Sequence, residues 1–151
     1  MHTAPMLAVP NGGFAPGWGF AVRAVLAGYA AIIAAFLASF FGVVGERVPQ
    51  KRTLGGRSMC SCGRVLRAVE LVPVAGWARL ALLHHSRATC CGAVVPARYG
   101  VSELIAALAA GLSFGLGGYW LWSWVASLAV LCGVLAWHVV AGIRLARRTI
   151  R

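Results

Sequence analysis

The sequence contains no aspartate, and its only carboxylate side chains are those of Glu46, Glu70 and Glu103. A peptidase that shares a proton between paired aspartates, and so activates water, cannot be built from this polypeptide alone. The three glutamates lie far apart in the sequence and do not suggest a substitute pair. Glycine-rich phosphate loops of the GxGxxG or Walker type are also absent, so nucleotide chemistry has no support in the sequence.

Charge is scarce, and it is almost entirely positive. Only 11% of the 151 residues are charged whereas 60% are hydrophobic, and the mean hydropathy is +0.81. This composition predicts an integral membrane protein. Fourteen Lys and Arg against three Glu make a formal net charge of +11. Because these charges lie next to apolar stretches, we expect membrane lipid as a partner, and no nucleic acid.

Three apolar stretches are long enough to cross a bilayer, for which about 20 helical residues are needed. They cover residues 20–44, 101–118 and 121–143. The predicted fold is therefore an all-α integral membrane protein with about three transmembrane helices. The second stretch is slightly short, so a hairpin over 101–143 that does not fully cross is the alternative. An extramembrane tail, residues 1–19, precedes the first span.

The long segment between the first two spans, residues 45–100, holds nine of the fourteen basic side chains. The positive-inside rule places this loop in the cytoplasm and the N-terminus outside. Four arginines in the last segment, residues 144–151, place the C-terminus in the cytoplasm by the same rule. Within the loop, the apolar run 71–83 is too short to span and is expected at the membrane interface or under the bundle.

Small residues recur at four-residue spacing in the spans. This spacing lets two helix backbones approach closely, so it predicts a packing seam; the alternative is simply an Ala-rich helix. The residues concerned are Ala27, Ala31 and Ala35, then Ala34, Ala38 and Gly42, and in the second span Gly111 and Gly115.

Four of the five cysteines form two clusters in the basic loop, "MCSCG" at 59–63 and "TCCGA" at 89–93. Thiols stay reduced in the cytoplasm, which disfavours a disulfide and favours metal or redox chemistry. Two cysteine pairs, each followed by glycine, resemble the knuckles of a four-cysteine zinc site. The usual knuckle leaves two residues between its ligands, so a vestigial site is the alternative. The candidate ligands are Cys60, Cys62, Cys90 and Cys91.

Other polar side chains have simpler interpretations. His84 and His85 can complete the zinc site if a thiol points away, but two adjacent histidines fit an interfacial position better. Cys132 is expected to be a small apolar filler of the third span. His138, near the cytoplasmic end of that span, is expected to reach the interface. Arg98 and Glu103 are candidates for an ion pair at the start of the second span.

Around the cysteines the sequence resembles the N-terminal region of the bacterial type IV prepilin peptidases. These membrane enzymes cleave, and in many cases N-methylate, pilin and pseudopilin precursors. The resemblance covers about residues 38–110, with Gly42 where the family has Asn. It rests on "ASFFGVVGERVP", "SMCSCG", "ELVP", "CCGA" and "RYGVSEL", which follow one another in the family's order.

The resemblance implies zinc at the four cysteines and S-adenosylmethionine as methyl donor. The family's catalytic aspartates, which belong to later spans, have no counterpart, so we expect no catalytic residue here. We predict a freestanding protein of the bacterial inner membrane, the accessory half of a split leader peptidase and methyltransferase of type IV pili or type II secretion. Its partners would be an aspartate-bearing chain and prepilin-like substrates. The alternative is a non-catalytic scaffold or degenerate homologue with a vestigial zinc site.

Overall fold

The computed structural model describes residues 16–56, 58–60, 62–117 and 121–149. The first fifteen residues of the predicted tail therefore lie outside the described residues. The fold is all-α, as predicted. Its elements are α1 (Pro16–Arg47), the short 3-10 helix η1 (Ala68–Glu70), α2 (Ala75–His84), α3 (Arg98–Gly117) and α4 (Leu121–Thr149).

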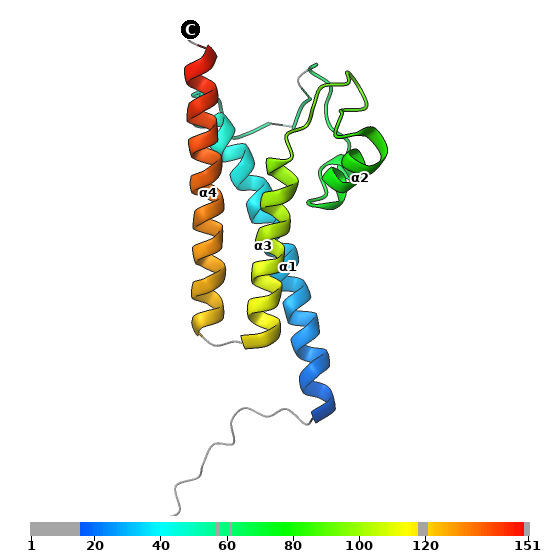
Figure 1. The fold of residues 1–151 in the computed structure, drawn as a ribbon, viewed down its shortest axis with the longest axis vertical. Helices are drawn as coiled ribbons and strands as arrows, with labels where there is room; N and C mark the ends of the chain where they lie inside the picture. The colour runs from blue at the N-terminus through cyan, green and yellow to red at the C-terminus, as the bar shows by residue number, and fades with distance from the viewer. Residues whose placement is uncertain (1–15, 57, 61, 118–120, 150–151) are drawn as a thin grey trace, which may run out of the picture.

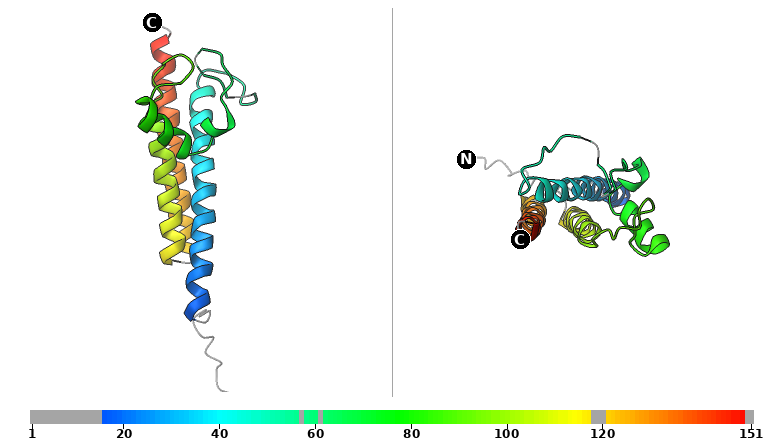
Figure 2. Two further views of the ribbon diagram at one scale, coloured as in Figure 1. Left: turned by 90° about the vertical axis from the view of Figure 1, so that its right-hand side faces the viewer. Right: turned by 90° about the horizontal axis from the view of Figure 1, so that it is seen from above.

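Helices α1, α3 and α4 run side by side as a bundle (Figure 1). Each contains a stretch long and apolar enough to cross a membrane: Gly19–Arg47, Arg98–Leu116 and Leu121–Arg147. Because α3 and α4 each have this length, two spans are favoured over the non-crossing hairpin. The long loop, the start of α3 and the end of α4 lie at one end of the bundle, called the loop end below (Figure 2).

The predicted seam of small residues is confirmed between α1 and α3. A Cβ added at Gly111 would lie 3.3 Å from the Cβ of Ala31, and one at Gly115 would lie 3.6 Å from that of Ala27. Lipid tails are as apolar as the helix surfaces, so close backbone packing holds such helices together. The buried core beside this seam consists of Ala34, Ala38, Ala106, Ala110 and Val134.

The expectation that His138 reaches the interface is wrong. His138 is 3% exposed and its Nε2 lies 2.9 Å from Oγ of Ser102, which is fully buried. Gly42 leaves room for this arrangement, since a Cβ there would lie 2.9 Å from the ring of Tyr99 and 3.6 Å from that of His138. A hydrogen-bond partner inside the bundle therefore offsets the cost of burying the imidazole.

Two other sequence expectations also need correction. Cys132 is exposed on α4, so it faces the surroundings of the bundle and fills no gap in its interior. Arg98 and Glu103 do not pair, because residues five apart point to different sides of a helix. The guanidinium of Arg98 instead donates to the hydroxyl of Tyr99 at 3.3 Å, and Glu103 accepts a hydrogen bond from the amide of Val74 at 2.6 Å.

The short helix α2 lies beside the loop end of α3 (Figures 1 and 2). Two contacts place it there. The ring of Trp77 lies so close to Gly100 that any side chain at residue 100 would collide with it. The bond from the Val74 amide to the buried carboxylate of Glu103 joins the start of α2 to the second turn of α3. These contacts fix the loop relative to the membrane helices.

Candidate metal centre

Two turns of the loop carry the four clustered cysteines. The first knuckle, residues 59–65, is closed by the bridge between Met59 and Val65, and the second knuckle, residues 87–94, by the bridge between Arg87 and Val94. In each knuckle the cysteine pair is followed by a glycine with positive φ, +84° at Gly63 and +68° at Gly92. Glycine adopts this left-handed conformation without the steric cost of a side chain, which explains the repeated Cys-Gly pattern.

The four thiols converge between the knuckles. Cys60 Sγ lies 3.4 Å from Cys91 Sγ, Cys62 Sγ lies 3.3 Å from Cys90 Sγ, and all four sulfurs lie within 4.8 Å of one another. Four sulfurs around a tetrahedral zinc, with bonds of about 2.3 Å, would lie about 3.8 Å apart. A disulfide would need an S–S distance of about 2.05 Å, well below both of these distances. The cluster can therefore bind a metal ion.

The shortened spacing within each knuckle does not keep the thiols apart. Each thiol finds a close neighbour on the other knuckle, and the turn that carries Cys90 and Cys91 is closed by a bond from the Gly92 amide to the Ala88 carbonyl, 2.9 Å long. His84 and His85 do not belong to the metal-ligand group that the described residues form, which consists of the four cysteines.

Neighbouring thiols hold Cys90 in the protonated form. Hydrogen bonds with Cys60 and Cys62, together with burial, raise the pKa of Cys90 to about 12, while Arg64 opposes this rise. The Cys90 thiol is therefore a poor nucleophile at neutral pH, since thiolates and not thiols react. A metal ion that displaces these protons would turn the same four groups into ligands.

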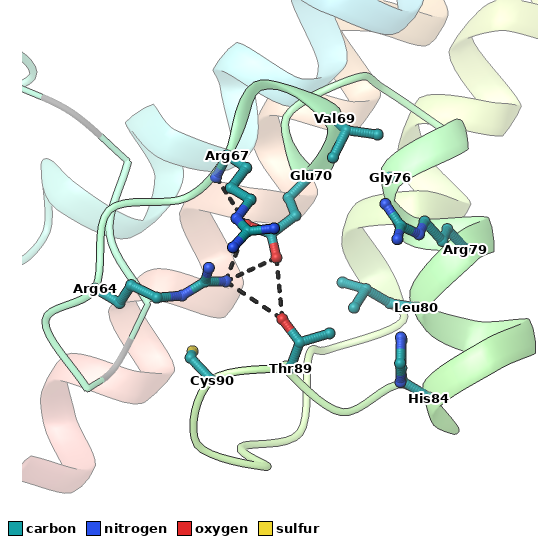
Figure 3. Close-up of a pocket in the computed structure, with 10 residues that line it drawn as sticks. All are labelled: Arg64, Arg67, Val69, Glu70, Gly76, Arg79, Leu80, His84, Thr89 and Cys90. Atoms are coloured by element: carbon teal, nitrogen blue, oxygen red, sulfur yellow. Dashed lines mark hydrogen bonds and ion pairs between the residues drawn. The ribbon is translucent and has the colours of Figure 1, made fainter.

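A polar network joins the two knuckles to η1 (Figure 3). Arg64, in the first knuckle, donates to both carboxylate oxygens of Glu70 at 2.7 and 3.0 Å and to Thr89 Oγ1 at 3.3 Å. Thr89, in the second knuckle, donates to the same carboxylate at 3.2 Å. The amide of Arg67 and then Arg64 lower the pKa of Glu70, so the carboxylate stays charged.

This network includes functional residues that the sequence analysis missed. The pKa of Arg64 is raised, first by its hydrogen bond with Cys90 and then by Glu70. The guanidinium therefore links the Cys90 thiol to the Glu70 carboxylate. One residue of this network could have been found from the sequence: Glu70, which occupies the acidic position of the "ELVP" motif. Nothing in the sequence singled out Arg64 or Thr89, because their roles depend on contacts across 6 and 19 residues of chain.

The fold and the site define a class of protein: a three-helix membrane bundle that carries a four-cysteine centre on the loop between its first two long helices. The family model described as Bacterial Peptidase A24 N-terminal domain matches residues 32–115, more than half of the chain. The chain belongs to this family, the N-terminal domain of the prepilin peptidases that its motifs resemble. No curated protein and no solved structure matches the chain.

Proposed function

We propose that this chain is the accessory half of a split prepilin leader peptidase, and that another polypeptide supplies the catalytic carboxylates. One observation carries the proposal: each glutamate of the chain is already bound by a group that is not a carboxylate. Glu46 accepts from the hydroxyl of Tyr99 at 2.6 Å, Glu70 is held by Arg64, and Glu103 is held by the Val74 amide. Two carboxyl groups that share a proton need each other as neighbours.

The loop end would face the cytoplasm of the bacterial inner membrane. Support for this orientation comes from the nine basic residues of segment 45–100 and the four of segment 144–151, because basic loops are retained inside. The orientation can be checked with C-terminal fusions. A fluorescent protein at the C-terminus should fluoresce, and an alkaline phosphatase there should be inactive; the opposite pattern would reverse the proposed topology.

In the reducing cytoplasm the four cysteines would hold zinc. Soft thiolate ligands in tetrahedral geometry suit zinc, and the sulfurs converge within 4.8 Å. A zinc ion with four protein ligands would act structurally, as a cross-link between the two knuckles. We do not extend the proposal to methyl transfer, because no contact among the described residues singles out a site for S-adenosylmethionine.

Processing of a prepilin leader peptide tests the proposed division of labour. The purified chain should give no cleavage, whatever its metal content. Co-expression with an aspartate-bearing peptidase of the same family should give a complex that co-purifies and cleaves, and Asp→Asn substitution in that partner should abolish cleavage. Cleavage by the single chain that is lost in Glu103→Gln would overturn the proposal. A chain that neither co-purifies with such a partner nor supports its cleavage would instead be a non-catalytic scaffold.

A further inference from the structure

A cavity of about 290 Å³ lies beside the cysteine centre, between η1, α2 and the second knuckle (Figure 3). The residues that line it include three arginines, Arg64, Arg67 and Arg79, and one carboxylate, Glu70. The wall therefore carries an excess of positive charge. His84, at the end of α2, lines it as well.

The carboxylate in this wall is not available to a ligand. Glu70 already accepts two hydrogen bonds from Arg64, one from Thr89 and one from the amide of Arg67. A carboxylate offers about four acceptor positions, so these partners saturate it. Glu70 neutralises Arg64 and leaves the other two arginines without a counter-charge in the wall.

The other described residues do not supply that counter-charge either. The described residues contain a single salt bridge, between Arg64 and Glu70. Glu46 and Glu103, which carry the other carboxylate side chains of the sequence, are bound at other places by Tyr99 and Val74. The cavity thus presents unmatched cationic donors, which an anion with several oxygens would satisfy.

The cavity lies where the membrane boundary is expected. Trp77 and Val74 fasten α2 to the first two turns of α3, where the apolar stretch of that helix begins. Next to the cavity, Leu82 and Leu83 at the end of α2 are 81% and 65% exposed. Exposed leucines beside cationic groups are typical of a helix that lies in the headgroup region of a bilayer.

We propose that this cavity binds a phosphate group, held by Arg67 from the η1 side and Arg79 from α2. A planar guanidinium can donate two parallel hydrogen bonds to two oxygens of one phosphate group, so phosphate should bind more tightly than a monovalent halide. The position of α2 favours the headgroup of an anionic phospholipid as the source of the phosphate; a soluble phosphate is the other source. The inference depends on the membrane location of the bundle and not on the proposed peptidase role.

Native mass spectrometry of the full chain in neutral detergent tests the proposal. Short-chain phosphatidylglycerol should be retained at one copy per chain, whereas diacylglycerol with the same acyl chains should not. The double variant Arg67→Gln with Arg79→Gln should weaken phosphatidylglycerol binding at least about tenfold, because two charge-assisted contacts are lost. Unchanged helical content and metal content would show that the variant still folds.

A matched control removes the same amount of charge from the same loop. Lys51→Gln with Arg52→Gln changes two exposed cations outside the cavity, and should alter binding by less than about threefold at physiological salt, where exposed charges are screened. Equal losses in the two double variants would overturn the proposal, as would equal retention of diacylglycerol. Titration with inorganic phosphate separates the sources: binding as tight as that of phosphatidylglycerol would overturn the lipid source, and much weaker binding would support it.

Discussion

Ser102 on α3 and His138 on α4 lie in hydrogen-bond contact inside the bundle, with 2.9 Å between Ser102 Oγ and His138 Nε2. The serine hydroxyl donates its one hydrogen to the Tyr99 carbonyl at 2.9 Å, so the imidazole must donate to the serine. The imidazole ring also stacks on that of Tyr99, which donates its hydroxyl to Glu46 on α1. Together these contacts join all three long helices. Because the serine hydroxyl donates to a carbonyl and not to the imidazole, the serine is not poised as a nucleophile.

Ser102→Ala is expected to destabilise the bundle by about 1 to 2 kcal/mol, because it leaves the ring N–H of His138 buried without an acceptor. Unfolding in mixed micelles measures this free energy. Combining Ser102→Ala with His138→Phe should cost less than the sum of the two single changes, since no polar group is then orphaned. Ser113→Ala, on the same helix, is the control; an equal loss there would contradict the proposed role of the contact.

The close crossing of α1 and α4 gives a second prediction. A side chain at Gly142 would collide with the carbonyl of Gly45, whereas one at Gly133, on the same helix, would meet nothing within 4 Å. Gly142→Ala should therefore lower the free energy of unfolding by about 1 to 3 kcal/mol. Gly133→Ala should be neutral or slightly stabilising, because Ala is the better helix former. Equal effects of the two substitutions would show that α1 and α4 do not cross here.

The cysteine centre predicts metal content. Protein purified without chelator should contain about one zinc per chain, and Cys62→Ser with Cys91→Ser should reduce this to below about one tenth, since each knuckle loses a ligand. Elemental analysis measures the content. Cys132→Ser should retain the metal, because Cys132 lies on α4 and outside the cluster. Protein that lacks zinc under these conditions would support the vestigial interpretation.

Glu70→Gln should loosen the two knuckles, because Arg64 and Thr89 lose their shared carboxylate. Loss of such an outer partner typically weakens metal binding by about 10- to 100-fold, and competition with a chelator measures the change. Glu46→Gln, which removes a carboxylate held by Tyr99, is the control and should bind metal as the unmodified chain does. Equal weakening in both variants would contradict a specific role for Glu70.

The effect of Glu70→Gln on the stability of the chain should depend on pH in a defined direction. The pKa of Glu70 is lowered in the folded chain, so its contribution to stability is fully present above the ordinary glutamate pKa of about 4.3 and is lost as the pH falls through the lowered value. The difference in thermal unfolding between the metal-free unmodified chain and Glu70→Gln should therefore be constant from neutral pH to about pH 5. It should shrink at lower pH. A difference that grew on acidification would have the wrong sign.

Several features follow from the sequence because local rules govern them. Bilayer thickness sets the length of an apolar helix, so the three long helices could be predicted from the apolar runs alone. Small residues four apart share one helix face, so Ala27 and Ala31 could be assigned to a seam before their partners Gly111 and Gly115 were known. The glycine after each cysteine pair likewise indicated two turns, because glycine readily adopts the left-handed conformation that such turns require.

The tertiary structure decided what depends on residues distant in the chain. Ser102 and His138 are 36 residues apart, and the two close cysteine pairs join residues 31 and 28 apart. His138 therefore lies in the interior instead of at the interface, and four thiols converge despite a spacing that departs from the usual knuckle. Arg64, Glu70 and Thr89 meet for the same reason. Hydrogen bonding and close packing act over a few ångströms of space, whereas sequence patterns report only the neighbourhood of each residue along the chain.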